Sequence, residues 1–144
     1  MQSCQPLVTA SPFVVYRIIS RPFYENTYVV IQSKSKDCLI VDPGFEPDAV
    51  IRFVDEHKLA PIAIVLTHGH SDHIAGVASI KQQWPLAPVL IGHGDAAKLS
   101  DPVANLSAGY GIDVISPPAD AIMREGEDLQ VGDFRATVVE IPGH

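Results

Sequence analysis

Three histidines and an aspartate lie within seven consecutive positions of this sequence. They are His68, His70, Asp72 and His73, in the stretch Thr-His-Gly-His-Ser-Asp-His, and the chain has only six histidines in all. Neutral imidazole is the commonest metal ligand among side chains, and carboxylate oxygens bind the same ions. Gly69 separates the first two histidines without a side chain that would obstruct an approaching ion. The stretch is therefore a candidate metal site.

The residues around this stretch predict two pairs of ligands on one loop. Residues 62–66 form a continuous apolar run, which indicates a strand buried on both faces that ends just before the histidines. His68 and His70 are two positions apart, so both rings can point the same way. Asp72 and His73 are adjacent, and a turn entering a helix can aim them at a second point nearby. Either metal shell needs further ligands from other parts of the chain.

Each of these residues also has an ordinary structural explanation when it is taken singly. A histidine between a strand and a helix is commonly a surface or capping residue, and Asp72 suits the N-cap of a helix expected from Ile74. Four such residues together, directly after a buried strand, favour a metal or catalytic site instead.

The elements that must position the candidate site follow from hydrophobic patterning. Residues 1–12 are expected to form a flexible leader. A β-meander is then predicted, with strands at 13–20, 27–32 and 38–41. Residues 47–58 carry apolar side chains on one face and predict a helix, whose acidic start and basic end suit the helix dipole.

The second half of the chain predicts further alternation of helices and strands. Expected helices are 74–84, stopped by Pro85, and a short one at 95–99; expected strands are 88–91, 121–123, 128–131 and 134–141; residues 100–120 are expected to be irregular. The pattern is mixed α/β (α+β). Its candidate site follows a buried strand, at the sheet edge where open sheets bind ligands.

Length and composition limit the possible functions. A chain of 144 residues favours a single domain, and a net charge of −7 without a basic run argues against a nucleic-acid partner. Two cysteines make no disulfide framework. The N-terminus shows no basic region followed by a long apolar run, and no apolar stretch approaches the ~20 residues that cross a bilayer. We therefore expect a cytoplasmic protein with no membrane partner.

The spacing His68-x-His70-x-Asp72-His73 after an apolar strand resembles the metal-binding motif of the metallo-β-lactamase superfamily. The segment 41–44, Val-Asp-Pro-Gly, resembles the one that precedes the first helix of that family. The segment 141–144, Ile-Pro-Gly-His, resembles the one that supplies its next histidine ligand.

Two further segments narrow this resemblance to one branch of the superfamily. Residues 25–28, Glu-Asn-Thr-Tyr, and residues 105–107, Asn-Leu-Ser, are similar to the branch that contains glyoxalase II, or hydroxyacylglutathione hydrolase. The resemblance covers residues 13–144, which would be an incomplete metallo-β-lactamase domain.

The resemblance implies a four-layer αββα sandwich with a dinuclear site at one edge. His68, His70 and His144 would hold the first metal, while Asp72 and His73 would help to hold the second. The bridging aspartate and the last histidine of the family come later in its sequences. The chain therefore resembles a fragment that ends after the third metal motif, with the C-terminal part of the domain missing.

The resemblance also implies a reaction. Two divalent ions, expected to be zinc with iron or manganese as alternatives, would lower the pKa of a shared water to near neutral. The resulting hydroxide would attack the carbonyl carbon of a small-molecule thioester such as S-lactoylglutathione. Asp72 would also be catalytic, by accepting a hydrogen bond from the attacking water. Asp42 is a candidate for orienting a ligand, with the shaping of its Asp-Pro-Gly turn as the alternative.

Other polar and aromatic residues have weaker patterns. His93 lies in a Gly-His-Gly turn after the strand expected at 88–91 and is a candidate to face the site, with an exposed loop histidine as the alternative. Tyr24 and Tyr110 are loop aromatics that would line a pocket or pack at a strand edge.

Three other functions remain open at this point. A persulfide dioxygenase with one iron, or another hydrolase of the superfamily such as a lactonase or β-lactamase, would use the same motif. A non-catalytic metal-binding remnant is the third. A nuclease is disfavoured because the chain is acidic and lacks a basic stripe.

Overall fold

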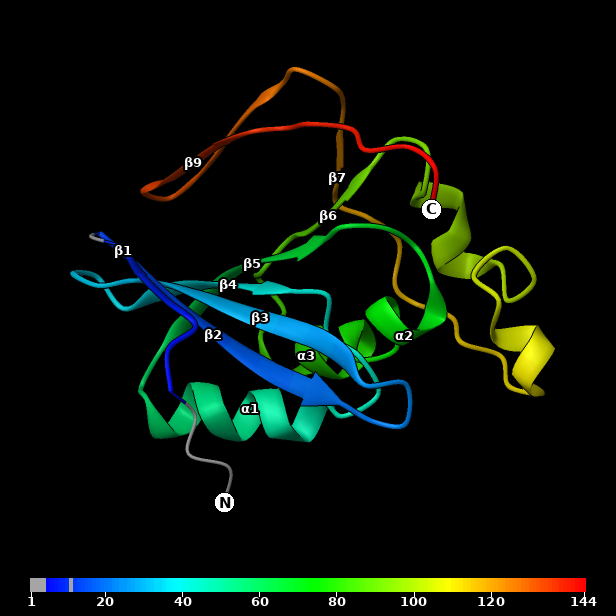
Figure 1. Ribbon diagram of the computed structural model, residues 1–144, viewed down its shortest axis with the longest axis horizontal. Helices are drawn as coiled ribbons and strands as arrows, with labels where there is room; N and C mark the ends of the chain where they lie inside the picture. Colours follow the sequence, from blue (N-terminus) through cyan, green and yellow to red (C-terminus); the bar gives the residue numbers. More distant parts are fainter. Residues whose placement is uncertain (1–4, 11) are drawn as a thin grey trace.

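Seven strands form one mixed sheet in this computed structural model, which describes residues 5–10 and 12–144 (Figure 1). The strands follow one another across the sheet in chain order: β1 (Val8–Ala10), β2 (Phe13–Ser20), β3 (Glu25–Gln32), β4 (Asp37–Val41), β5 (Ala60–Leu66), β6 (Val89–Gly92) and β7 (Ala121–Met123). Strands β1 to β4 pair antiparallel, and β4 to β7 pair parallel. The predicted meander is thus confirmed as β2, β3 and β4.

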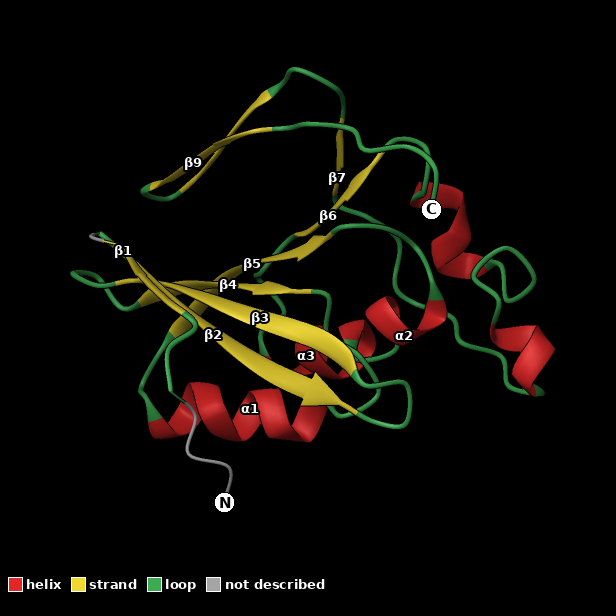
Figure 2. Ribbon diagram, viewed as in Figure 1, coloured by secondary structure: helices red, strands yellow, loops and turns green. Residues whose placement is uncertain are grey.

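Helices make the crossovers that parallel strands require. Helix α1 (Pro47–Glu56) connects β4 to β5, while α2 (Ser71–Ile74) and α3 (Val77–Gln83) connect β5 to β6. Figure 2 shows α1 and α3 on one side of the sheet. No helix in the described part of the chain is long and apolar enough to span a membrane.

The main core lies between this helix layer and the sheet. Alternate residues of β3, among them Val29 and Ile31, are buried, because strand side chains alternate between the two faces. Fully burying a side chain of this kind contributes ~1.5–3 kcal/mol. The cluster also contains Ile40, Val50, Phe53, Val54, Ile64, Leu66, Ile74, Val77, Ile80, Val89 and Ile91.

A separate hairpin covers part of the other face of the sheet. Strands β8 (Asp128–Val131) and β9 (Phe134–Thr137) pair antiparallel, and the ring of Phe134 stacks on that of Phe13 in β2 with centroids 5.2 Å apart. Tyr16, three residues after Phe13 in β2, contacts Phe53 of α1 at 4.9 Å. The hairpin and α1 therefore lie on opposite faces of β2. The described residues thus form a helix layer, a sheet and a hairpin, and a second helix layer is not among them.

Several predicted elements differ from the structure. Residues 8–10, expected in the flexible leader 1–12, form β1 and pair with β2, so the leader prediction is wrong there; residues 1–4 and 11 lie outside the described part. Strand β9 ends at Thr137, short of the predicted 141. The short helix at Ala96–Ser100 is a 3-10 helix, here η1, and a second one, η2 (Ser107–Tyr110), lies in the region expected to be irregular.

The single helix predicted at 74–84 is divided at Gly76. The backbone N–H of Gly76 donates to the carbonyl of Pro43 at 2.8 Å, and a Cβ at position 76 would lie 2.5 Å from the carbonyl oxygen of Gly44. The helix is interrupted because its backbone packs directly against the turn that follows β4. This contact holds α2 and its candidate ligands beside that turn.

Candidate metal centre

The parallel pairing of β4 and β5 brings two loops together at one edge of the sheet. Val41 and Val65 are register partners, and the backbone N–H of Asp42 donates to the carbonyl of Val65 at 3.1 Å. Asp42, which follows β4, therefore lies beside Thr67, which follows β5. The predicted histidine-rich loop begins at this point.

Asp42 organises that loop through its carboxylate, which is buried with only 3% of the residue exposed. Its Oδ1 accepts the backbone N–H of Thr67 at 2.7 Å. Its Oδ2 accepts the Thr67 hydroxyl and lies 3.0 Å from Nδ1 of His73. Asp42 has a left-handed φ of 50°, which aspartate tolerates better than most residues. The carboxylate thus faces three donors.

The protons of this network determine which nitrogen of His68 is free. The Thr67 hydroxyl has one proton, and it goes to the Asp42 carboxylate, which can only accept. Nδ1 of His68, 2.9 Å from the Thr67 hydroxyl oxygen, must therefore donate to it. That leaves Nε2 of His68 unprotonated, and this atom is buried without a hydrogen-bond partner. A buried lone pair of this kind fits a metal ligand.

Three imidazole rings converge around that free nitrogen. The ring centroids of His68, His70 and His144 lie 4.7–4.9 Å from one another. One ligand atom from each lies within 4.8 Å of the others. Figure 1 shows the C-terminal residue beside the loop between β5 and α2, although it is remote in sequence. This set can hold one metal ion through three nitrogens.

Burial and nearby charges keep the rings of His68 and His70 in the neutral form that binds metals. Burial, followed by the nearby charge of His73, lowers the pKa of His68 to about 4. Burial also lowers the pKa of His70, and the charges of His144 and Lys98 lower it further. Both rings are therefore neutral near pH 7, so no proton has to leave before a metal binds.

Asp72 and His73 form a second pair on the first turn of α2. Oδ2 of Asp72 lies 3.7 Å from Nε2 of His73, and Nδ1 of His73 faces Asp42. Burial by itself lowers the pKa of His73, but the hydrogen bond to Asp42 and the charges of Asp42, Asp72 and Glu25 raise it above its ordinary value. The pair can supply one oxygen and one nitrogen to an ion.

A second grouping of ligand atoms joins Asp42 to His68 and His73, again within 4.8 Å. The oxygens of Asp42 already face three donors. We therefore interpret Asp42 as the residue that orients Thr67 and His73 rather than as a ligand.

Sequence patterning missed Glu25 as a member of this region. Its side chain is 1% exposed, its Oε2 lies 3.2 Å from the Thr27 hydroxyl, and its buried Oε1 has no hydrogen-bond partner and lies 3.9 Å from Nδ1 of His73. Burial, above all, raises the pKa of this carboxyl to about 8. A glutamate at the start of a strand gives no sequence signal for such a position, because only the neighbouring loops bury it.

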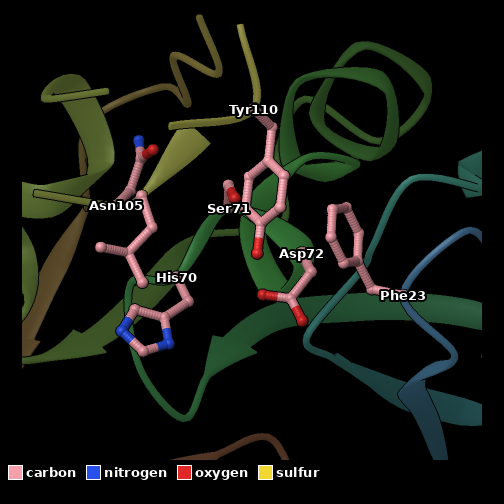
Figure 3. Close-up of a pocket in the computed structure, with 7 residues that line it drawn as sticks. Phe23, His70, Ser71, Asp72, Asn105 and Tyr110 are labelled. Carbon is pink, nitrogen blue, oxygen red and sulfur yellow. The ribbon is translucent and has the colours of Figure 1, made fainter. Parts of the chain in front are cut away.

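A pocket opens on the side of the ligands, with a volume of about 150 Å³. Figure 3 shows His70 at the left and Phe23 at the right, with Asp72 and the ring of Tyr110 between them. The full lining is Phe23, His70, Ser71, Asp72, Asn105, Leu106 and Tyr110. Tyr110 therefore lines a pocket, whereas Tyr24 is 69% exposed and does not line this one.

His93 stands apart from these groups. It is exposed in the turn after β6, and its backbone N–H donates to the carbonyl of Met123 at 2.9 Å. Within the described ranges, it belongs to neither ligand group and does not line the pocket. The structure therefore does not bring His93 to the site.

Comparison with known sequences was consistent with this geometry. The sequence profile of the Metallo-beta-lactamase superfamily matches residues 20–144. The "Probable metallo-hydrolase YqgX" of Bacillus subtilis is 34% identical over 124 residues, which are 85% of this chain and 57% of that protein. A hydroxyacylglutathione hydrolase of Pectobacterium atrosepticum is 32% identical over 128 residues, 88% of this chain and 43% of the relative. The chain thus spans about half the length of these relatives.

A similar structure has also been solved. The BLEG-1 B3 metallo-β-lactamase superposes with a TM-score of 0.85 at 31% sequence identity, over 90% of this chain and 62% of that one.

Proposed function

The chain belongs to the metallo-beta-lactamase superfamily, and on this basis we propose that the protein is a metal-dependent hydrolase that cleaves a thioester such as S-lactoylglutathione. The observation that carries the proposal is the free, buried Nε2 of His68 within a set of three imidazoles. In the proposal this set, completed by His70 and His144, holds one divalent ion. Asp72 and His73 contribute to a second ion. Zinc is the proposed metal, with iron or manganese as alternatives.

When bound, such ions polarise a carbonyl group and lower the pKa of a nearby water. The residues of the chain provide the rest of the chemistry. Asp72 lines the pocket and accepts a hydrogen bond from the attacking water, which directs its oxygen to the thioester carbonyl carbon. Asp42 holds Thr67 and His73 in place, so that the ligand nitrogens keep their orientation.

The bonds of the reaction balance without another co-reactant. The oxygen of water bonds to the carbonyl carbon, the carbon–sulfur bond breaks, and the products are a carboxylic acid and a thiol. The thiolate is a good leaving group, so the reaction needs little acid catalysis. Among the residues that line the pocket, Asp72 is the one with an acidic side chain.

Each of two candidate substrates is supported by one similarity to known proteins. Hydroxyacylglutathione hydrolases at 30–32% identity support the thioester. The similarity to the BLEG-1 B3 metallo-β-lactamase supports a β-lactam as the second candidate, because water would attack its carbonyl carbon in the same way.

The test uses the complete protein that contains this chain, loaded with zinc. Hydrolysis of S-lactoylglutathione and of a chromogenic cephalosporin is measured before and after treatment with a strong chelator, and again after zinc is restored. We expect chelator-sensitive, zinc-restorable hydrolysis of the thioester. Hydrolysis of the cephalosporin alone would select the second candidate, and no hydrolysis of either by metal-loaded protein would reject both.

A further inference from the structure

The pocket beside the ligands has a chemically mixed lining. His70 and Asp72 are among its polar side chains, and Phe23, Leu106 and Tyr110 contribute apolar surface. Figure 3 shows the hydroxyl end of Tyr110 pointing toward the space between His70 and Asp72, while its ring faces Phe23. A ligand that fits this mixed lining has a polar reacting group joined directly to an apolar substituent.

Two aromatic rings from distant parts of the chain, those of Phe23 and Tyr110, meet at this pocket. Phe23 comes from the turn between β2 and β3, and Tyr110 comes from η2. Their ring centroids are 4.9 Å apart in an edge-to-face arrangement, and Phe23 also contacts Phe45 at 5.6 Å. Phe23 is 36% exposed and Tyr110 64%, so their faces remain available to a ligand. Exposed apolar groups that gather beside a polar site commonly mark a binding surface.

The segment that precedes η2 is hydrogen-bonded directly to the ligand loop. The backbone N–H of Ser71, between His70 and Asp72, donates to the carbonyl of Asn105 at 2.9 Å. The side chain of Asn105 is buried, its amide donates to the carbonyls of Lys98 and Val114, and its oxygen accepts the N–H of Ser107. Asn105 therefore fixes the conformation of this loop.

Leu106 is held in an unusual conformation at this point. Its φ of 71° is in the left-handed region, which is uncommon for leucine, and its side chain is 51% exposed while it lines the pocket. The loop thus presents an apolar side chain to the pocket rather than burying it.

From this arrangement we propose that the pocket binds an apolar or aromatic substituent of the substrate. This substituent lies next to the scissile carbonyl and packs against Phe23 and Tyr110. The protein then prefers thioesters with a bulky apolar group over the small, hydroxylated lactoyl group. This inference rests on the proposed thioesterase function and specifies its substrate class. The substituent is carried either on the acyl carbon or on the sulfur.

The test compares kcat/KM across two thioester series with the zinc-loaded complete protein. One series varies the acyl group from acetyl to butyryl to phenylacetyl on one small polar thiol. The other keeps acetyl and varies the thiol from methyl to benzyl. Preference within the first series assigns the pocket to the acyl group, and preference within the second assigns it to the thiol.

Three variants identify the residues responsible. We expect Phe23→Ala and Tyr110→Ala each to reduce the preference for the aromatic substrate by up to about tenfold, mainly through KM, because each removes an aromatic ring that packs against the substituent. Tyr110→Phe retains the ring and should retain the preference. Tyr24→Ala is the matched control, because Tyr24 is an exposed aromatic next to Phe23 that does not line the pocket.

A binding measurement keeps this inference separate from the proposed function. The Kd of an unreactive phenacyl thioether is measured by calorimetry for the same variants. Binding that weakens in Phe23→Ala and Tyr110→Ala but not in Tyr24→Ala supports the pocket, even if no thioester is hydrolysed and the proposed function fails. Equal affinity in all variants, or a preference unchanged by both alanine substitutions, would overturn the pocket while leaving the thioesterase proposal intact.

Discussion

At the scale of single residues, the Thr67 hydroxyl determines the chemical state of the ligand beside it. It donates to Asp42 and accepts from Nδ1 of His68, so it leaves the lone pair of His68 on Nε2. A residue that is not itself a candidate ligand thereby sets the tautomer of a candidate metal ligand. This arrangement leads to a direct test.

We expect Thr67→Val to weaken zinc binding by about 10–100-fold, because His68 loses the acceptor that orients its ring and fixes its tautomer. Thr67→Ser keeps the hydroxyl and should bind zinc as the wild type does. Competition with a chromophoric chelator gives both Kd values. Equal affinity in the valine and serine variants would show that the hydroxyl has no orienting role.

The two histidines that share this network should titrate far apart in the metal-free protein. NMR of the imidazole nitrogens should place the pKa of His68 at about 4 and that of His73 above 6.5. Because its folded pKa is raised, the stabilising contribution of His73 is present below pH 6.5 and is lost as the pH rises through its folded pKa. Zinc bound through His73 should therefore be released first on acidification. Titration of His68 above 6.5 would contradict this prediction.

Glu25 should make the metal-free protein less stable as the pH rises. Its pKa is raised from 4.5 to about 8, so the unfolded chain binds fewer protons than the folded one between these values, and stability falls across that window. Glu25→Gln removes this effect, and urea unfolding at pH 5 and pH 8 should show a smaller difference than in the wild type. The exposed Glu56→Gln is the control and should behave as the wild type. An unchanged pH dependence in Glu25→Gln would refute the prediction.

At the scale of elements, the division between α2 and α3 positions the ligands. Apolar periodicity predicts one helix over 74–84, because periodicity depends only on neighbours along the chain. The close contact of Gly76 with Pro43 and Gly44 comes from a segment more than thirty residues earlier. Local pattern therefore located the helical region and could not locate its interruption.

A side chain at this division should be costly. Gly76→Ala places a Cβ 2.5 Å from the Gly44 carbonyl oxygen, so the turn after β4 must shift, and we expect ~1–3 kcal/mol of lost stability. Zinc affinity should fall with it, because that turn carries Asp42. Gly94→Ala is a suitable control, since a Cβ there has nothing within 4 Å. Denaturant unfolding measures the difference in stability. Equal stability of the two variants would show that close packing at Gly76 does not limit the stability of the protein.

At the scale of the whole molecule, the order of strands in the sheet assembles the site. Parallel pairing of β4 with β5 places Asp42 beside Thr67, and the packing of α2 against the turn after β4 adds His73. The stacked rings of Phe13 and Phe134 hold the β8–β9 hairpin on the opposite face from α1. The chain then returns toward the ligand loop, where His144 lies.

The sequence by itself determined the chemistry of the ligand loop and most of the strands. His68, His70, Asp72 and His73 lie within one loop, so their types and spacing carry the information, and alternation along β2 and β3 marks strands for the same local reason. The resemblance to a family added His144. These inferences needed no knowledge of distant contacts.

Only the tertiary structure decided how the protons, the buried acid and the pocket are arranged. The tautomer of His68 depends on Asp42, and the burial of Glu25 depends on the loops around it. The aromatic contact at the pocket joins Phe23 to Tyr110, which are 87 positions apart in the sequence. Burial and hydrogen-bond partners are properties of residues that are close in space and far apart along the chain. Local sequence patterns do not predict such contacts, because the contacts form only when the folded sheet brings the loops together.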